Sequence, residues 1–160
     1  MFRIGQSSDI HQLGNGRKLI LGGVEIEHEK GLLGHSDADA LTHAIAESIL
    51  GALALGDLGT HFPDTDKRYA GANSLDLLSC VYAMMIEKGY RIGNIDALLM
   101  IERPKMAPHI LQMRKNIASC LHCALEQVSI KATRGEKLGF VGREEGVLAQ
   151  SVVLLVKGEK

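Results

Sequence analysis

The 160-residue chain lacks tryptophan, has only three tyrosines and three phenylalanines, and has no excess of either charge. With 18 Lys and Arg against 19 Asp and Glu, no global field attracts nucleic acid or an anionic membrane surface. The scarcity of aromatic rings further weakens a role based on base stacking. We therefore expect no nucleic-acid partner.

Long apolar runs and cysteines are also scarce. No stretch reaches the ~20 apolar residues that a membrane helix needs, and the first residues, "MFRIGQSSDI", lead into a strand without a targeting pattern. The three cysteines, Cys80, Cys120 and Cys123, are an odd number that fits free thiols in a reducing compartment. We expect a cytoplasmic protein with no membrane partner.

The chain is long enough for one domain with a sizeable core, and 46% of its residues are apolar. We find no repeat, linker or low-complexity tract, so residues 1–160 are expected to form a single domain. Periodicity, caps and turn residues predict three helices, at 37–55, 73–89 and 108–125. Strands are predicted at 2–12, 18–27, 92–102, 128–133 and 147–157, with loops at 55–72 and 134–146.

This pattern predicts an α/β (α+β sandwich) fold, in which a small mixed sheet has helices packed on one face. The other face of so small a sheet would stay uncovered, and association through it is expected.

The segment "SSDIHQL" places Asp9 and His11 two residues apart in a strand, so both side chains point to one face and Ile10 is expected to face a core. A carboxylate and an imidazole at this spacing are either an ordinary hydrogen-bonded pair or part of a metal site. On this segment alone we favour the ordinary pair. His43, in "HSDADALTH", points away from the apolar stripe of its helix, and it either completes a metal site or lies hydrogen-bonded beside the core.

Three further segments carry polar groups. "GDLGTHFPDTD" has Asp57, Asp64 and Asp66, which are either turn formers or substrate ligands. "CLHC" resembles half a zinc knuckle, but no second pair exists and helical packing is favoured. "ATRGEKLGF" offers backbone amides, Arg134 and Lys137, in a loop of a kind that binds phosphate.

Several of these segments in this order, with "KGYRIGNID", "RPKMAPHI" and "GREEG", resemble the 2-C-methyl-D-erythritol 2,4-cyclodiphosphate synthase family over essentially the whole chain. The resemblance implies a homotrimer with active sites shared between adjacent subunits. It also implies one divalent metal per subunit, usually zinc, bound by Asp9, His11 and His43, and a second metal, Mg or Mn, contacted by Glu136 and substrate phosphates.

The implied reaction is an intramolecular phosphoryl transfer, in which 4-diphosphocytidyl-2-C-methyl-D-erythritol 2-phosphate loses CMP and forms a cyclic diphosphate. A strong general base is unnecessary, because a phosphate whose second pKa is about 6 is already largely an anion. Bringing two anions together and stabilising the charge on the leaving phosphate is the harder task.

The resemblance further implies which residues contact substrate. His35, with a catalytic role, and Ser36 hold the erythritol phosphate, and Asp9 and His11 contact substrate as well. The same end is held by Asp57, Leu58, Gly59, Phe62, Pro63, Asp64, Thr65 and Asp66. The cytidine is held by Pro104, Lys105, Met106, Ala107, Ala132 and Thr133. Phe140, Arg143 and Glu145 match positions near the trimer axis, where an isoprenoid diphosphate binds in some members, although Arg143 and Glu145 are equally explained as a structural ion pair.

Two residues depart from the family pattern. Ser7 stands where a glycine is usual, before Asp9. Arg134 stands where a threonine assigned to transition-state stabilisation is usual, and either takes over phosphate stabilisation as a catalytic residue or points to solvent. Two other functions stay open: a metal-dependent phosphohydrolase, and a trimeric binding protein without activity, for which Arg134 is the sequence hint.

Overall fold

The computed structural model describes residues 1–158. Its main sheet has five strands in the order β4-β1-β7-β5-β6. The strands are β1 (Phe2–Gly14), β4 (Gly31–Leu32), β5 (Tyr90–Met100), β6 (Val128–Thr133) and β7 (Gly146–Lys157). The pair β5 and β6 is parallel and the other pairs are antiparallel, which confirms the predicted mixed sheet. The segment 18–27, predicted as strand, forms a separate hairpin of β2 (Leu19–Leu21) and β3 (Val24–Ile26), which turns at Gly22 and Gly23.

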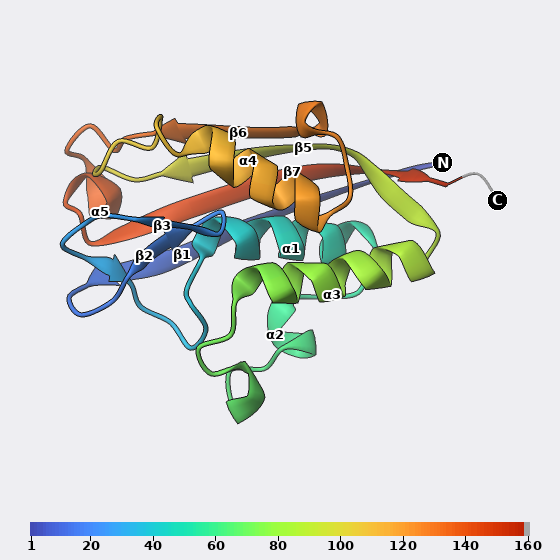
Figure 1. Cartoon of the computed structure of the whole chain (residues 1–160), viewed down its shortest axis with the longest axis horizontal. Helices are drawn as coiled ribbons and strands as arrows, with labels where there is room; N and C mark the ends of the chain where they lie inside the picture. Colours follow the sequence, from blue (N-terminus) through green and yellow to red (C-terminus); the bar gives the residue numbers. More distant parts are fainter. Residues whose placement is uncertain (159–160) are drawn as a thin grey trace.

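The long helices lie on one side of the main sheet (Figure 1). They are α1 (Ala40–Ala52), α3 (Ser74–Glu87) and α4 (Ile110–Cys120). Helix α1 packs on β1 and β7, and its Leu41, Ile45 and Ile49 are fully buried. A Cβ atom at Gly5 of β1 would lie 1.9 Å from the carbonyl oxygen of Ser48, so only glycine allows the helix to approach the strand this closely.

The opposite face of the sheet is open and carries apolar side chains. Ile4, Ile10 and Val152 are 72%, 61% and 50% exposed. The expectation that Ile10 faces a core in this chain is therefore wrong, because the covering helix lies on the side of Asp9 and His11 instead.

Several predicted boundaries were also wrong. Helix α1 begins at Ala40 and not at 37, because Asp39 is its N-cap and Ala38 has a φ of 59°, which lies outside the helical region. The predicted loop 55–72 contains α2 (Leu58–His61) and the 3-10 helix η1 (Lys67–Tyr69). The predicted third helix ends at Cys120, and a second 3-10 helix, η2 (Leu125–Gln127), follows it before β6. A short helix, α5 (Gly139–Gly142), interrupts the predicted loop 134–146.

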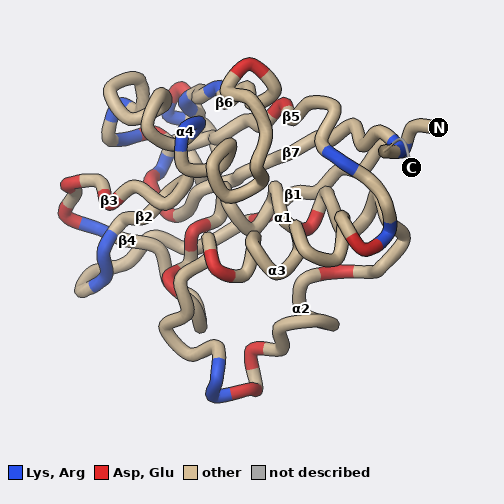
Figure 2. The backbone as a smooth tube through the Cα atoms, turned by 45° about the vertical axis from the view of Figure 1, so that its right-hand side comes forward, with Lys and Arg blue, Asp and Glu red and all other residues tan. Residues whose placement is uncertain are grey.

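Basic and acidic residues are both spread over many parts of the fold (Figure 2), in keeping with the near-zero net charge. None of the helices among residues 1–158 is long and apolar enough to cross a membrane.

Candidate metal and substrate site

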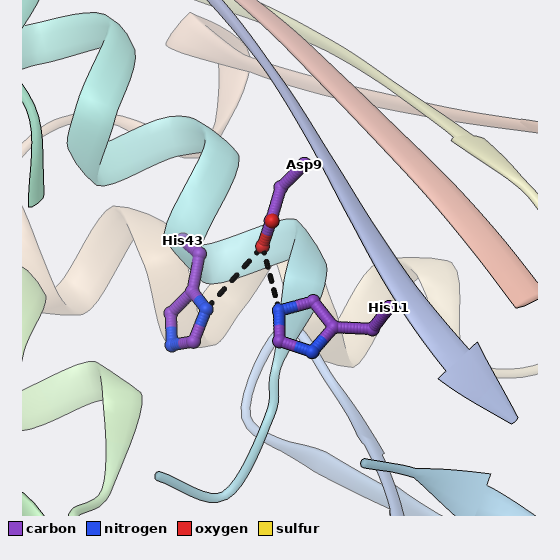
Figure 3. A group of neighbouring side chains, drawn as sticks. All are labelled: Asp9, His11 and His43. Carbon is purple, nitrogen blue, oxygen red and sulfur yellow. Dashed lines mark hydrogen bonds and ion pairs between the residues drawn. The ribbon is translucent and has the colours of Figure 1, made fainter. Parts of the chain in front are cut away.

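Asp9, His11 and His43 come together between β1 and the first turn of α1 (Figure 3). Asp9 Oδ2 lies 3.0 Å from His11 Nε2 and 3.3 Å from His43 Nδ1. One potential ligand atom from each residue lies within 4.8 Å of the others, and all three residues are partly buried. The geometry thus confirms the same-face arrangement of Asp9 and His11 and adds His43 to it.

The outward nitrogens of the two imidazoles are bonded as well. His11 Nδ1 lies 2.8 Å from the carbonyl oxygen of Leu33, which only accepts, so His11 carries a proton on Nδ1. His43 Nε2 lies 2.7 Å from the hydroxyl of Ser74. Partners of this kind fix the orientation of metal-bound histidines in other proteins.

Asp9 and His11 stabilise each other's charged forms. Burial alone would raise the pKa of the Asp9 carboxyl, but hydrogen bonds and attraction from His11 and His43 outweigh it and lower that pKa. Burial alone would lower the pKa of His11, but the bond and charge of Asp9 and the Leu33 carbonyl raise it. The cluster therefore favours a cation beside an ionised Asp9.

The donor set fits a divalent metal. A carboxylate oxygen and two imidazole nitrogens are ligands that zinc accepts, and three protein ligands leave a fourth position for substrate. In neutral His11, Nδ1 carries the proton and Nε2 directs its lone pair at Asp9 Oδ2. The lone pair and the carboxylate repel each other, and a metal cation between them would remove this repulsion.

A cavity of about 290 Å³ opens beside this cluster, and we call it the histidine pocket. His11, His43, His35 and Ser36 line it together with Leu58, Phe62 and Asp64 from the predicted substrate segment. His35 Nε2 lies 3.2 Å from the carbonyl oxygen of Asp66, which ties the two segments together. The structure thus groups these predicted residues around the Asp9–His11–His43 cluster.

The remaining aspartates of the substrate segment have structural contacts. Asp57 caps α2 and accepts bonds from the amide and hydroxyl of Thr60, which lower the pKa of Asp57. Asp66 caps η1 and pairs with Arg68 at 2.6 Å. The turn-forming interpretation therefore holds for both. Gly59 lies within α2, and Pro63 and Thr65 lie in the turn between α2 and η1.

A second cavity of about 340 Å³ lies where β5 and β6 end, and we call it the proline pocket. It is lined by the predicted cytidine residues with Arg134, Ile101 and Ile110: Pro104, Lys105, Met106, Ala107, Ala132 and Thr133. The two pockets share no lining residue.

The segment after β6 differs from the expectation in one respect. Its amides were expected to be free, but those of Gly135 and Lys137 donate to the Glu102 carboxylate at 2.8 and 3.3 Å. Arg134 lies 3.7 Å from Glu136, and both side chains are largely exposed. Glu136 is not part of the Asp9 cluster.

The last predicted residues lie around α5. Phe140 is within α5, and Arg143 pairs with Glu145 at 2.8 Å, in agreement with the ion-pair interpretation. All three cysteines are free. Helix α4 ends at Cys120 and Cys123 lies beyond it, so the prediction that a helix contains all of "CLHC" is wrong. The segment forms no metal cluster among the described residues.

Sequence patterns do not reveal every residue around the Asp9–His11–His43 cluster. Ser74 stands at the start of a predicted helix with no sign of its contact with His43, and the carbonyl of Leu33 carries no sequence signal at all. Tyr69 and Leu77, which also line the histidine pocket, were missed because apolar pocket walls resemble core residues in a sequence.

Comparison with known proteins identifies the family. The model of the YgbB family matches residues 2–156. A 2-C-methyl-D-erythritol 2,4-cyclodiphosphate synthase from Desulfitobacterium hafniense is 59% identical over 157 residues, which cover 98% of this chain and 99% of the relative. The solved structure of the bifunctional IspDF from Campylobacter jejuni superposes with a TM-score of 0.93 at 41% identity, covering 97% of this chain and 42% of that one. IspF from Plasmodium falciparum, solved as a CDP complex, gives 0.87 at 35% identity and covers 99% and 97%. The chain therefore belongs to the YgbB family, as the resemblance of its sequence segments implied.

Proposed function

We propose that the histidine pocket of one copy and the proline pocket of an adjacent copy together form the active site of a cyclodiphosphate synthase. The reaction is the CMP-releasing ring closure of 4-diphosphocytidyl-2-C-methyl-D-erythritol 2-phosphate, catalysed by a phosphorus–oxygen lyase of the non-mevalonate isoprenoid pathway. The observation that carries the proposal is the Asp9–His11–His43 cluster opening into a pocket that holds His35 and Ser36.

Asp9, His11 and His43 hold the first metal, which we assign as zinc from the nitrogen and oxygen donor set. When bound, this ion supplies positive charge to phosphate oxygens. The protein's own part is to keep three ligands on two rigid elements, a strand and a helix, so that little reorganisation is needed when substrate arrives.

Around this centre, His35 and Ser36 hold the phosphate of the erythritol end, with His35 as the catalytic contact. Asp64 and the neighbouring backbone bind its hydroxyls, while Leu58 and Phe62 form the apolar wall. The contacts of Asp57 and Asp66 within their own turns mean that these two carboxylates shape the segment and do not need to touch substrate.

The proline pocket holds the cytidine. It is lined by residues 104–107 and 132–133 together with Ile101 and Ile110, and the apolar side chains among them suit contact with a flat base. The CDP complex of the Plasmodium falciparum relative supports a nucleotide ligand for this fold. Arg134 and Lys105 add positive charge at the rim, where phosphates would lie.

The open sheet face supports association of copies. Ile4, Ile10 and Val152 remain exposed there. A second copy would cover these side chains, and a heterologous contact between copies closes into a ring, which we propose to be a trimer. The site is then completed by the adjacent copy.

Two further assignments depend on this assembly. Glu136 would contact a second metal, Mg or Mn, together with substrate phosphates, because its exposed carboxylate lies beside Arg134 at the rim of the proline pocket. Phe140 and Arg143, which lie near the start of β7, would face a central cavity with room for an isoprenoid diphosphate.

Mixing two inactive variants tests the shared site. His43→Ala disables the histidine pocket, and Ala132→Phe fills the proline pocket without touching the metal ligands. In an equal mixture, half of the copies have an intact histidine pocket and the other half an intact proline pocket. If each site joins one pocket from each of two adjacent copies, refolding the variants together should restore CMP release at about a quarter of the sites. No recovery above the two separate variants would contradict a shared site, and CMP release by the wild type that survives complete removal of metal would contradict the metal assignment.

A further inference from the structure

We propose that Asp37 and Ser74 act as positioning residues for His43, by fixing the proton on its outward nitrogen and thereby directing the inner nitrogen at the metal. The inference rests on the metal site proposed above. It concerns two residues that lie outside the predicted ligand set, on the loop before α1 and at the first residue of α3.

The geometry is a chain of three hydrogen-bonding groups. Ser74 Oγ lies 2.7 Å from His43 Nε2, and the same hydroxyl donates a hydrogen bond to the carboxylate oxygen Oδ1 of Asp37. Ser74 is completely buried, so water does not compete for these bonds. The hydroxyl of Ser36 is a second neighbour of His43 Nε2, at the longer distance of 3.2 Å.

The direction of each bond follows from the proton count. A serine hydroxyl has one proton, and an ionised carboxylate only accepts, so the Ser74 proton goes to Asp37. The contact between Ser74 and His43 must then be donated by the imidazole. His43 therefore carries its proton on Nε2, and the lone pair of Nδ1 points toward Asp9 and the metal position.

Asp37 is itself held in place. Its Oδ2 accepts from the backbone amide of Ser74 at 3.1 Å, and its Oδ1 accepts from the amide of Asp39 at 3.1 Å. Three hydrogen-bond donors thus converge on this carboxylate and fix its orientation toward the Ser74 hydroxyl. The negative charge polarises the Ser74 hydroxyl and, through it, makes His43 a better electron-pair donor.

The consequence concerns metal affinity. Loss of an outer partner of a metal-bound histidine typically weakens metal binding 10–100-fold. Ser74→Ala removes the hydroxyl and leaves all three ligands in place, so it should weaken zinc binding by about this factor. The test measures zinc dissociation constants by chelator competition on metal-free protein at fixed pH.

Ser48→Ala is the matched control. Ser48 is also a completely buried serine whose hydroxyl makes two bonds, to the Ile45 carbonyl and to Ser151, but it does not touch the metal ligands. Both variants should lower the Tm of the metal-free protein, whereas only Ser74→Ala should change the zinc dissociation constant. Zinc binding by Ser74→Ala within twofold of the wild type, or an equal loss in Ser48→Ala, would overturn the positioning role.

A second measurement needs no variant. Long-range 1H–15N spectra of metal-free wild-type protein, recorded where His43 is neutral, should place its proton on Nε2. A proton on Nδ1 overturns the inference even where Ser74→Ala fails to fold. Wild-type protein that binds no zinc refutes the metal site itself, which is a different result from zinc binding that is indifferent to Ser74.

Discussion

The two pockets of this chain are built differently. In the histidine pocket, both nitrogens of the His11 and His43 imidazoles have a polar neighbour, and these neighbours come from β1, the loop before α1 and the first turn of α3. In the proline pocket, the charged group Arg134 is 60% exposed, and its ionic neighbour Glu136 is 76% exposed. The polar groups of the histidine pocket are therefore fixed by contacts within the chain, whereas the charged groups of the proline pocket are held loosely and largely exposed.

This difference separates two tasks of the reaction. Metal ligands must be held in position before substrate arrives, because misplacement of a ligand directly costs metal affinity. Long charged side chains at a rim need only reach phosphate oxygens once the nucleotide is bound. Substitutions in the histidine pocket should accordingly have large effects, and those at the proline pocket rim smaller ones.

Removing a metal ligand should have the largest effect. His43→Ala and Asp9→Asn should both lose zinc and lower the rate of CMP release by about a thousandfold or more, since a bound metal contributes several kcal/mol to stabilising phosphoryl charge. Metal content by mass spectrometry and steady-state kinetics measure this, with circular dichroism as the control for folding. Full metal occupancy in His43→Ala would contradict the assignment.

The cluster of Asp9, His11 and His43 was predictable from the sequence, whereas the groups that hold its side chains in position were not. Asp9 and His11 share a face because strands alternate, and His43 was found because it points away from an apolar stripe. Ser74 lies 31 residues from His43 in the chain, and no local periodicity connects them. The predicted start of α1 was wrong by three residues for a similar reason. Asp39, the N-cap, is held by bonds from the amides of Gly22 and Gly23 in the distant hairpin as well as from Thr42, and no local pattern shows these contacts.

Ile10 shows the other limit of prediction from sequence. Alternation shows that Ile10 faces away from Asp9, but it does not show which face the helices cover. That choice depends on the packing of α1 against Gly5 and its neighbours, a contact between residues far apart in the sequence.

The next largest effect should come from pH. His11 must be neutral to bind metal, and its pKa in the metal-free protein is raised above 6.5, while the lowered pKa of Asp9 keeps that carboxylate ionised throughout this range. As pH falls through the pKa of His11, protons should displace the metal, and below it the zinc affinity should fall at least about tenfold per pH unit. Chelator competition between pH 5 and 8 measures this. An affinity that stays constant across this range would be inconsistent with His11 as a ligand.

Arg134 should have a moderate effect. If it binds a phosphate oxygen through a charge-assisted hydrogen bond, Arg134→Ala should lower kcat/KM about tenfold or more. Arg134→Lys should retain part of the rate, because a lysine keeps the charge but loses the two-pronged geometry. Arg134→Thr introduces the family's usual residue and tests whether a hydroxyl suffices. Unchanged kinetics in Arg134→Ala would show that the pairing with Glu136 is the whole role of this arginine.

The smallest effect on rate should come from Ser7, the other departure from the family pattern. Its hydroxyl donates to Glu47 Oε2 at 2.5 Å, and Glu47 Oε1 accepts from the Leu58 amide at the start of α2. The strand is not disturbed, because Ser7 pairs with Ser151 in regular register.

Ser7→Gly removes a buried bond to a carboxylate and adds backbone freedom, so the free energy of unfolding should fall by about 2 kcal/mol. Ser7→Ala keeps the Cβ and separates the loss of the bond from the change in backbone freedom. Because Glu47 stays on α1 and keeps its bond to Leu58, the rate of either variant should stay within about twofold of the wild type. A tenfold slower Ser7→Ala enzyme of normal Tm would instead place Ser7 among the residues that position the histidine pocket.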